Sequence, residues 1–202
     1  GPAPKPTSCS TAIAAGRWSV ASSYARRATL ATMTTSDLRT DLDRLADARA
    51  AYAALASRVA AGEPWPLATA FGTEPEASWG PREVLSHVAE MLPFWLGELE
   101  RVVDGDGVKA VPFGRVSEDA SRIGLIARDR SLPLRVLFGR IDAGLSAWLD
   151  RLPKLTDADR ANVGLHPRLG EMPVVGIAGR FVIGHAEEHV VQLGSILAAA
   201  GR

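Results

Sequence analysis

Two histidines near the C-terminal end of the chain have a spacing that suits metal binding. They stand in the run His185-Ala186-Glu187-Glu188-His189. At about 100° per helical residue, four steps bring His189 to within roughly 40° of His185, so both imidazoles project from one face of a helix. Such a pair can chelate a metal ion. The motif is short, however, and the same spacing also suits two core histidines that bind no metal.

A third histidine lies on the apolar face of another expected helix. His87 stands beside Val84, Val88 and Met91, so it can also point into the core. Three inward histidines from two helices would match an open catalytic metal site, with three protein ligands and water completing the shell. The fourth histidine, His166, falls in an expected loop. There we expect it to be solvated or to cap a backbone group rather than to bind metal.

Three polar residues near these histidines can assist a metal, although each can also have an ordinary structural role. Glu188 can orient a ligand imidazole or remain a solvated helix residue. Gln192, on the same side of the helix as His189, can bind an imidazole or the external ligand of an open site. Glu90 follows His87 within one helical turn and can approach the metal from that helix.

The apolar periodicity predicts four long amphipathic helices and one short helix. Their expected limits are 36–61, 81–103, 117–130 (the short helix, capped by Ser117), 132–152 and 173–200. Pro93 is expected to kink the second helix. Segments 63–80 and 153–171 are expected to be loops, with Trp65 and Trp79 either lining a pocket mouth or anchoring the first loop. No strand alternation is evident, so we predict an all-α fold, a four-helix bundle with long crossing loops.

Composition and charge narrow the classes of function. The 202 residues are 47% hydrophobic, and 23 basic residues balance 23 acidic ones. A net charge of zero disfavours binding to nucleic acid or to an anionic membrane. The single cysteine, Cys9, cannot form an internal disulfide or a CxxC metal site, so a metal must use histidines and carboxylates. No apolar stretch reaches the roughly 18 residues of a membrane-spanning helix, so we expect a soluble, cytoplasmic protein.

The N-terminal segment differs in composition from the rest of the chain. Residues 1–36 contain four basic residues and no acidic one. Such a segment resembles an organelle transit peptide, but it also arises from a wrongly chosen upstream start codon or from artificially added residues. Because Met33 is followed by Thr34-Thr35-Ser36-Asp37, which suits the start of a helix, we predict a poorly structured or extraneous leader at 1–33 and one domain at 34–202.

Two motifs resemble the DinB-like superfamily of four-helix metalloproteins. The first is Trp79-Gly80-Pro81-Arg82-Glu83-Val84-Leu85-Ser86-His87, which is similar to the W-(s/t)-x-x-(e/d)-(v/l)-(l/v)-x-H opening of that superfamily's second helix. The second is Gly184-His185-Ala186-Glu187-Glu188-His189-Val190-Val191-Gln192-Leu193, which is similar to its G-H-x-x-x-H-x-x-Q-L motif in the last helix. A softer similarity covers residues 166–172. The resemblance extends over residues 36–200.

The resemblance implies a metal centre and an activity. The superfamily includes bacterial thiol S-transferases and mycothiol-dependent maleylpyruvate isomerases. By this resemblance His87, His185 and His189 are the ligands of a divalent metal ion, most simply zinc or nickel, with iron or manganese as alternatives. The resemblance also implies a homodimer.

The expected activity is a metal-dependent thiol transfer or isomerisation on a small-molecule substrate. A divalent ion on three neutral imidazoles lowers the pKa of a thiol or water at its open position. Because Cys9 lies in the leader, the thiol would be a low-molecular-weight cosubstrate such as mycothiol. Two alternatives remain open at this point. One is a non-enzymatic, dimeric helical bundle that binds a metal or small ligand, and the other is a metal-dependent hydrolase.

Overall fold

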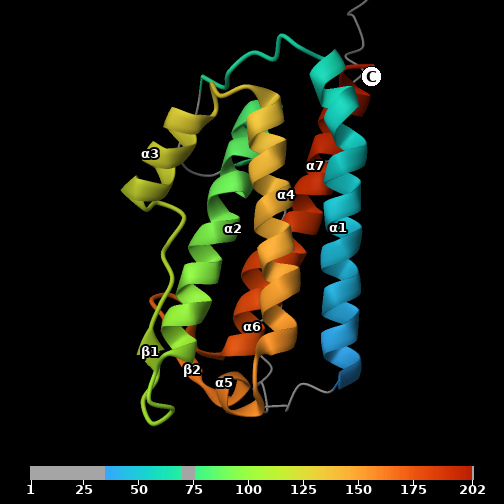
Figure 1. The fold of residues 1–202 in the computed structure, drawn as a ribbon. Helices are drawn as coiled ribbons and strands as arrows, with labels where there is room; N and C mark the ends of the chain where they lie inside the picture. The colour runs from blue at the N-terminus through green and yellow to red at the C-terminus, as the bar shows by residue number, and fades with distance from the viewer. Residues whose placement is uncertain (1–34, 70–75, 202) are drawn as a thin grey trace, which may run out of the picture. The chain divides into compact units, whose positions relative to one another are not determined.

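The protein consists mostly of long helices packed against one another. A computed structural model describes residues 35–69 and 76–201, and the predicted leader, residues 1–33, lies outside them. The long helices are α1 (Thr35–Ala61), α2 (Pro81–Val103), α4 (Leu134–Arg151) and α7 (Gly184–Ala199). Helix α4 packs against α1 and α2, and α7 packs against the same two helices (Figure 1). The first three predicted long helices are therefore confirmed, and α7 forms the C-terminal part of the fourth.

The predicted apolar stripes face the space between these helices. On α1 the expected three- and four-residue steps separate the buried residues Leu45, Ala48, Tyr52, Leu55 and Val59. The Tyr52 hydroxyl donates a hydrogen bond to the carbonyl of Ala186, at 3.0 Å. Burial raises the pKa of Tyr52, so this hydroxyl stays protonated and donates at neutral pH. This bond attaches α1 to α7 one residue after His185.

Particular residues fix the start of helix α2 and its contact with α4. Pro81 occupies the first helical position, where its missing N–H has no helical partner to lose. The Glu83 carboxylate accepts a hydrogen bond from the backbone N–H of Gly80, at 3.2 Å. Pro93 lies inside the helix without ending it. Next to it, Trp148 Nε1 of α4 donates to the carbonyl of Leu92 at 3.0 Å, which fastens α4 to α2.

The all-α prediction is wrong in one respect, because the fold contains a small sheet. Strand β2 (Val163–His166) pairs in parallel with β1 (Val111–Pro112) and antiparallel with β3 (Gly170–Pro173). The predicted loop at 153–171 also contains η2 (Leu152–Lys154) and α5 (Asp157–Ala161). These strands have at most four residues, which is too short for a period-two pattern to stand out in the sequence.

The short helix α3 (Ala120–Asp129) starts later than predicted. Asp119 is its cap, because the Asp119 carboxylate accepts a hydrogen bond from the N–H of Arg122 at 2.9 Å. Ser117, the predicted cap, instead donates its hydroxyl to Glu118, at 3.0 Å. The later start places Arg122 in the first turn of α3.

The last predicted helix is divided by a π turn. Helix α6 (Val174–Ala178) is followed by the π-helical segment η3 (Gly179–Ile183) and then by α7. The buried residues Val174, Ala178, Val182 and Ala186 recur at four-residue steps. In a regular α-helix each such step drifts by about 40°, and the wider π turn offsets that drift. The π turn therefore keeps these four residues facing the core as far as Ala186, which follows His185.

Among the described residues, no helix combines the length and the apolar composition needed to cross a membrane.

Candidate metal centre

The structure brings together the three histidines that the sequence singled out. Nε2 of His185 lies 2.9 Å from Nε2 of His87 and 3.1 Å from Nε2 of His189. His87 comes from α2, and the other two come from adjacent turns of α7. His87 and His189 are buried, whereas His185 is half-buried. The helical spacing therefore does place both α7 imidazoles on one face, and that face meets His87.

A carboxylate that the sequence reasoning missed completes the group. Glu76 lies in the short helix η1 (Glu76–Ser78) of the crossing segment before α2. Its Oε2 is 3.9 Å from Nε2 of His189. The ligand atoms of Glu76 and the three histidines all lie within 4.8 Å of one another. Glu76 belongs to no periodic helical pattern, so the sequence does not distinguish it from Glu63 of the same segment. Glu63 pairs with Arg82 instead.

The contacts of His189 decide which of its ring nitrogens carries the proton. Nδ1 of His189 lies 2.7 Å from Oε1 of Gln192. The Gln192 amide nitrogen is already committed, because it donates to the carbonyl of Glu76 at 2.9 Å. Oε1 of Gln192 therefore acts as an acceptor, and we assign the proton of His189 to Nδ1. Nε2 of His189 is left with a bare lone pair directed at His185.

The same reasoning applies to His185. Its Nδ1 lies 3.5 Å from a carboxylate oxygen of Glu188, which can only accept. With its proton on Nδ1, facing Glu188, His185 presents the lone pair of Nε2 to the other histidines. In that form His185 and His189 present lone pairs to each other across 3.1 Å. A cation resolves this repulsion, and zinc–imidazole bonds of about 2.0–2.1 Å place tetrahedral ligand atoms roughly 3.3 Å apart. The donor set thus fits a divalent metal ion.

Burial keeps the two enclosed imidazoles neutral. It lowers the pKa of His87 well below its ordinary value, and the neighbouring His185 and His189 lower it further. Burial, followed by the effect of His185, lowers the pKa of His189 to about 3. Neutral imidazoles can bind a metal without first losing a proton.

On the side away from His185, packing holds the ring of His87. Its Nδ1 is buried and has no hydrogen-bond partner within the described part of the chain. Its ring meets the buried ring of Trp79 edge to face, with 5.6 Å between centroids. Trp65 donates from Nε1 to the carbonyl of Val59, at 2.7 Å. Both tryptophans therefore anchor the crossing segment, which was one of their two predicted roles.

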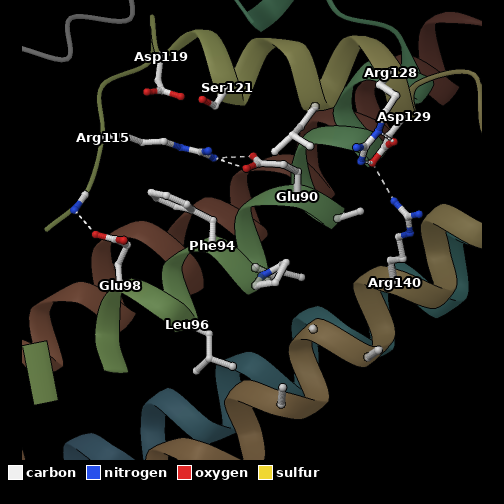
Figure 2. A pocket seen from close by; sticks show the side chains of 18 of the residues that line it. Glu90, Phe94, Leu96, Glu98, Arg115, Asp119, Ser121, Arg128, Asp129 and Arg140 are labelled. Atoms are coloured by element: carbon white, nitrogen blue, oxygen red, sulfur yellow. Dashed lines mark hydrogen bonds and ion pairs between the residues drawn. The ribbon is translucent and has the colours of Figure 1, made fainter. Parts of the chain in front are cut away.

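Glu90 does not approach the histidines, contrary to prediction. Both of its carboxylate oxygens accept hydrogen bonds from Arg115, at 2.5 and 2.6 Å, and that guanidinium lies over the ring of Phe94. Burial raises the pKa of Glu90, against the opposing effect of Arg115. The pair lines a largely apolar groove of about 1020 Å³ (Figure 2), and neither Glu76 nor any of the three clustered histidines lines that groove.

His166 lies outside the centre, as expected, but not in a loop. It ends strand β2 and is buried. Its Nδ1 accepts hydrogen bonds from the N–H groups of Arg168 and Leu169, at 3.2 and 3.3 Å. Its Nε2 lies 3.2 Å from the carbonyl of Arg115, to which it donates. Of the two roles expected for this histidine, solvated residue or cap of backbone groups, the structure shows the second.

No family model, curated protein or solved structure matches this chain.

Proposed function

We propose that this protein is a divalent-metal protein of the DinB-like kind and acts as a metal-dependent thiol S-transferase. His87, His185 and His189 would hold the ion, with Glu76 as a fourth, weaker ligand. The observation that carries the proposal is the convergence of these four side chains, whose ligand atoms all lie within 4.8 Å of one another. On the outer side of the group, Gln192 lies 2.7 Å from Nδ1 of His189 and Glu188 lies 3.5 Å from Nδ1 of His185. Such outer partners are typical of histidines that bind metals.

The donor set favours zinc or nickel. Neutral imidazoles suit both of these ions, and iron or manganese would be weaker alternatives. When bound, the ion would supply a Lewis-acid centre that lowers the pKa of a thiol or water. The surrounding residues keep the imidazoles neutral and limit the access of bulk water, because His87, His189 and Trp79 are each less than 5% exposed.

A thiol cosubstrate follows from the residues available in the chain. The sole cysteine is Cys9, which lies outside the described residues, so none of the described residues around the centre offers a thiol. The two sequence motifs, and the position of their three histidines in one cluster, support the resemblance to thiol transferases. On the same resemblance we propose that the protein forms a homodimer.

The test begins with the metal content of the wild-type protein purified without chelator. We expect about one equivalent of zinc or nickel per chain, lost in His185→Ala and retained in Glu90→Gln. Glu90 is the matched control, because it lies on α2 within one turn of His87 but pairs with Arg115. A metal-free wild-type protein that gains no thermal stability from zinc or nickel would refute the metal centre.

An activity assay with and without a small thiol tests the second half of the proposal. Transfer of the thiol to an electrophilic substrate, absent in His185→Ala, would support the transferase. Turnover of ester or amide substrates that needs metal but no thiol would overturn it in favour of a hydrolase, because water would then be the nucleophile.

A further inference from the structure

A buried arginine reaches the metal centre from helix α3. Arg122 is only 5% exposed, and its NH2 group pairs with Oε1 of Glu76. Its NH1 group donates to the carbonyl of Ser117 at 3.0 Å, and its guanidinium lies 5.6 Å from the ring of Trp79. Neither the two motifs nor the periodicity of the sequence singles out this residue.

The two carboxylate oxygens of Glu76 therefore have different surroundings. Oε1 is bound by Arg122, while Oε2 faces the histidines, 3.9 Å from Nε2 of His189. The backbone of Glu76 is fixed separately, because its carbonyl accepts a hydrogen bond from Gln192. The carboxylate can consequently turn between the centre and Arg122 by side-chain rotation alone, without movement of the crossing segment.

We propose that Arg122 is a positioning residue that makes Glu76 an exchangeable ligand of the metal centre. This inference rests on the proposed function. When an external ligand such as a thiol occupies the fourth position, Arg122 would hold the displaced carboxylate. Without Arg122, the displaced carboxylate would be a half-buried charge that has lost its arginine partner, which is unfavourable. Arg122 would thus lower the free-energy cost of replacing Glu76 with an external ligand at the metal.

The experiment uses the full chain loaded with Co²⁺, whose visible absorption reports changes in coordination. Imidazole is the main probe, because it is neutral and is little affected by the charge of Arg122. We expect Arg122→Met to weaken imidazole binding by about tenfold, the lower end of the usual effect of outer partners of metal ligands. Glu76→Gln should bind imidazole more tightly than the wild type does. Arg122→Lys, which keeps a donor and the charge, should recover part of the loss.

The double variant separates positioning from a general charge effect. If Arg122 acts through Glu76, Arg122→Met should have no effect on imidazole binding in the Glu76→Gln background. Arg115→Met is the matched control, since it removes another largely enclosed guanidinium that is paired with a carboxylate outside the centre. It should bind imidazole as the wild type does.

The outcomes distinguish this inference from the proposed function. A wild-type protein that binds no Co²⁺ overturns both. Co²⁺ binding together with wild-type imidazole affinity in Arg122→Met overturns only the role of Arg122. If Arg122→Met fails to fold, the Glu76→Gln variant still tests the proposal. Unchanged or weaker imidazole binding in Glu76→Gln would contradict an exchangeable Glu76.

Discussion

The side-chain amide of Gln192 bridges His189 and the backbone of Glu76. Its oxygen lies 2.7 Å from Nδ1 of His189, and its nitrogen donates to the Glu76 carbonyl at 2.9 Å. Gln192 therefore orients an imidazole of α7 and also holds the backbone of the segment before α2 that contains Glu76. The reversed amide would place its oxygen against the Glu76 carbonyl, two acceptors with no hydrogen between them, so the geometry admits one orientation only.

Gln192→Leu should weaken metal binding without unfolding the protein. The substitution removes the acceptor that keeps the proton of His189 on Nδ1, and loss of such partners commonly lowers metal affinity by about 10- to 100-fold. Competition with a chromophoric chelator measures the affinity. Glu188→Gln is the comparison, because Glu188 is largely exposed and lies 3.5 Å from Nδ1 of His185. Its effect should be the smaller of the two, and equal effects would contradict the greater importance of the Gln192 contact.

Two glycines of α4 should respond in opposite directions to alanine. A Cβ atom at Gly144 would lie 2.8 Å from Cβ of Leu92 on α2, so Gly144→Ala should destabilise the protein by about 1–3 kcal/mol. A Cβ atom at Gly139 meets nothing within 4 Å, so Gly139→Ala should stabilise it by about 0.5–1 kcal/mol. Urea unfolding measures both. A stabilising Gly144→Ala would show that α2 and α4 are not packed this closely.

The protein should lose stability on acidification partly through His166. Burial lowers the pKa of His166, against the effect of its hydrogen bond to Arg115. The unfolded chain therefore takes up a proton more readily, so the stabilising contribution is complete above the unfolded pKa of about 6.5 and declines as the pH falls below it. Protonation of Nδ1 would also displace two backbone donors.

His166→Asn provides the measurement for this pH dependence. Its amide oxygen can replace Nδ1 as an acceptor but does not titrate. In the presence of chelator, the free energy of unfolding should fall more between pH 7.5 and pH 5.5 in the wild type than in the variant. His87 and His189 titrate in both proteins, so their contributions cancel. Equal losses would show that His166 does not contribute.

The features that the sequence predicts well are those with a long helical period. The buried stripes of α1, α2 and α4 and the convergence of His87, His185 and His189 follow from residues repeated at three- and four-residue steps. Each stripe involves many residues, so the pattern tolerates an exception such as Pro93 inside α2. Gln192 was found for the same reason, since it lies one turn beyond His189.

The features that the sequence does not predict depend on contacts between distant segments. Glu76 and Arg122 are 46 residues apart, and no local pattern indicates that they meet. Glu90 is one turn from His87 but faces Arg115, because its direction along α2 differs by about 60° from that of His87. The strands are too short to show alternation. The π turn before His185 reflects core packing, which the helical period alone does not reveal.

Bound metal should stabilise the folded protein, because the four ligands come from segments that separate on unfolding. With free ion at 100 times its dissociation constant, the gain is about 2.7 kcal/mol, which corresponds to a rise in Tm of roughly 5–10 °C for a domain of this size. Chelator should reverse it. His185→Ala should show no rise, whereas His166→Asn should show the full rise, since His166 lies outside the centre. A rise that persists in His185→Ala would place the stabilising metal at another site.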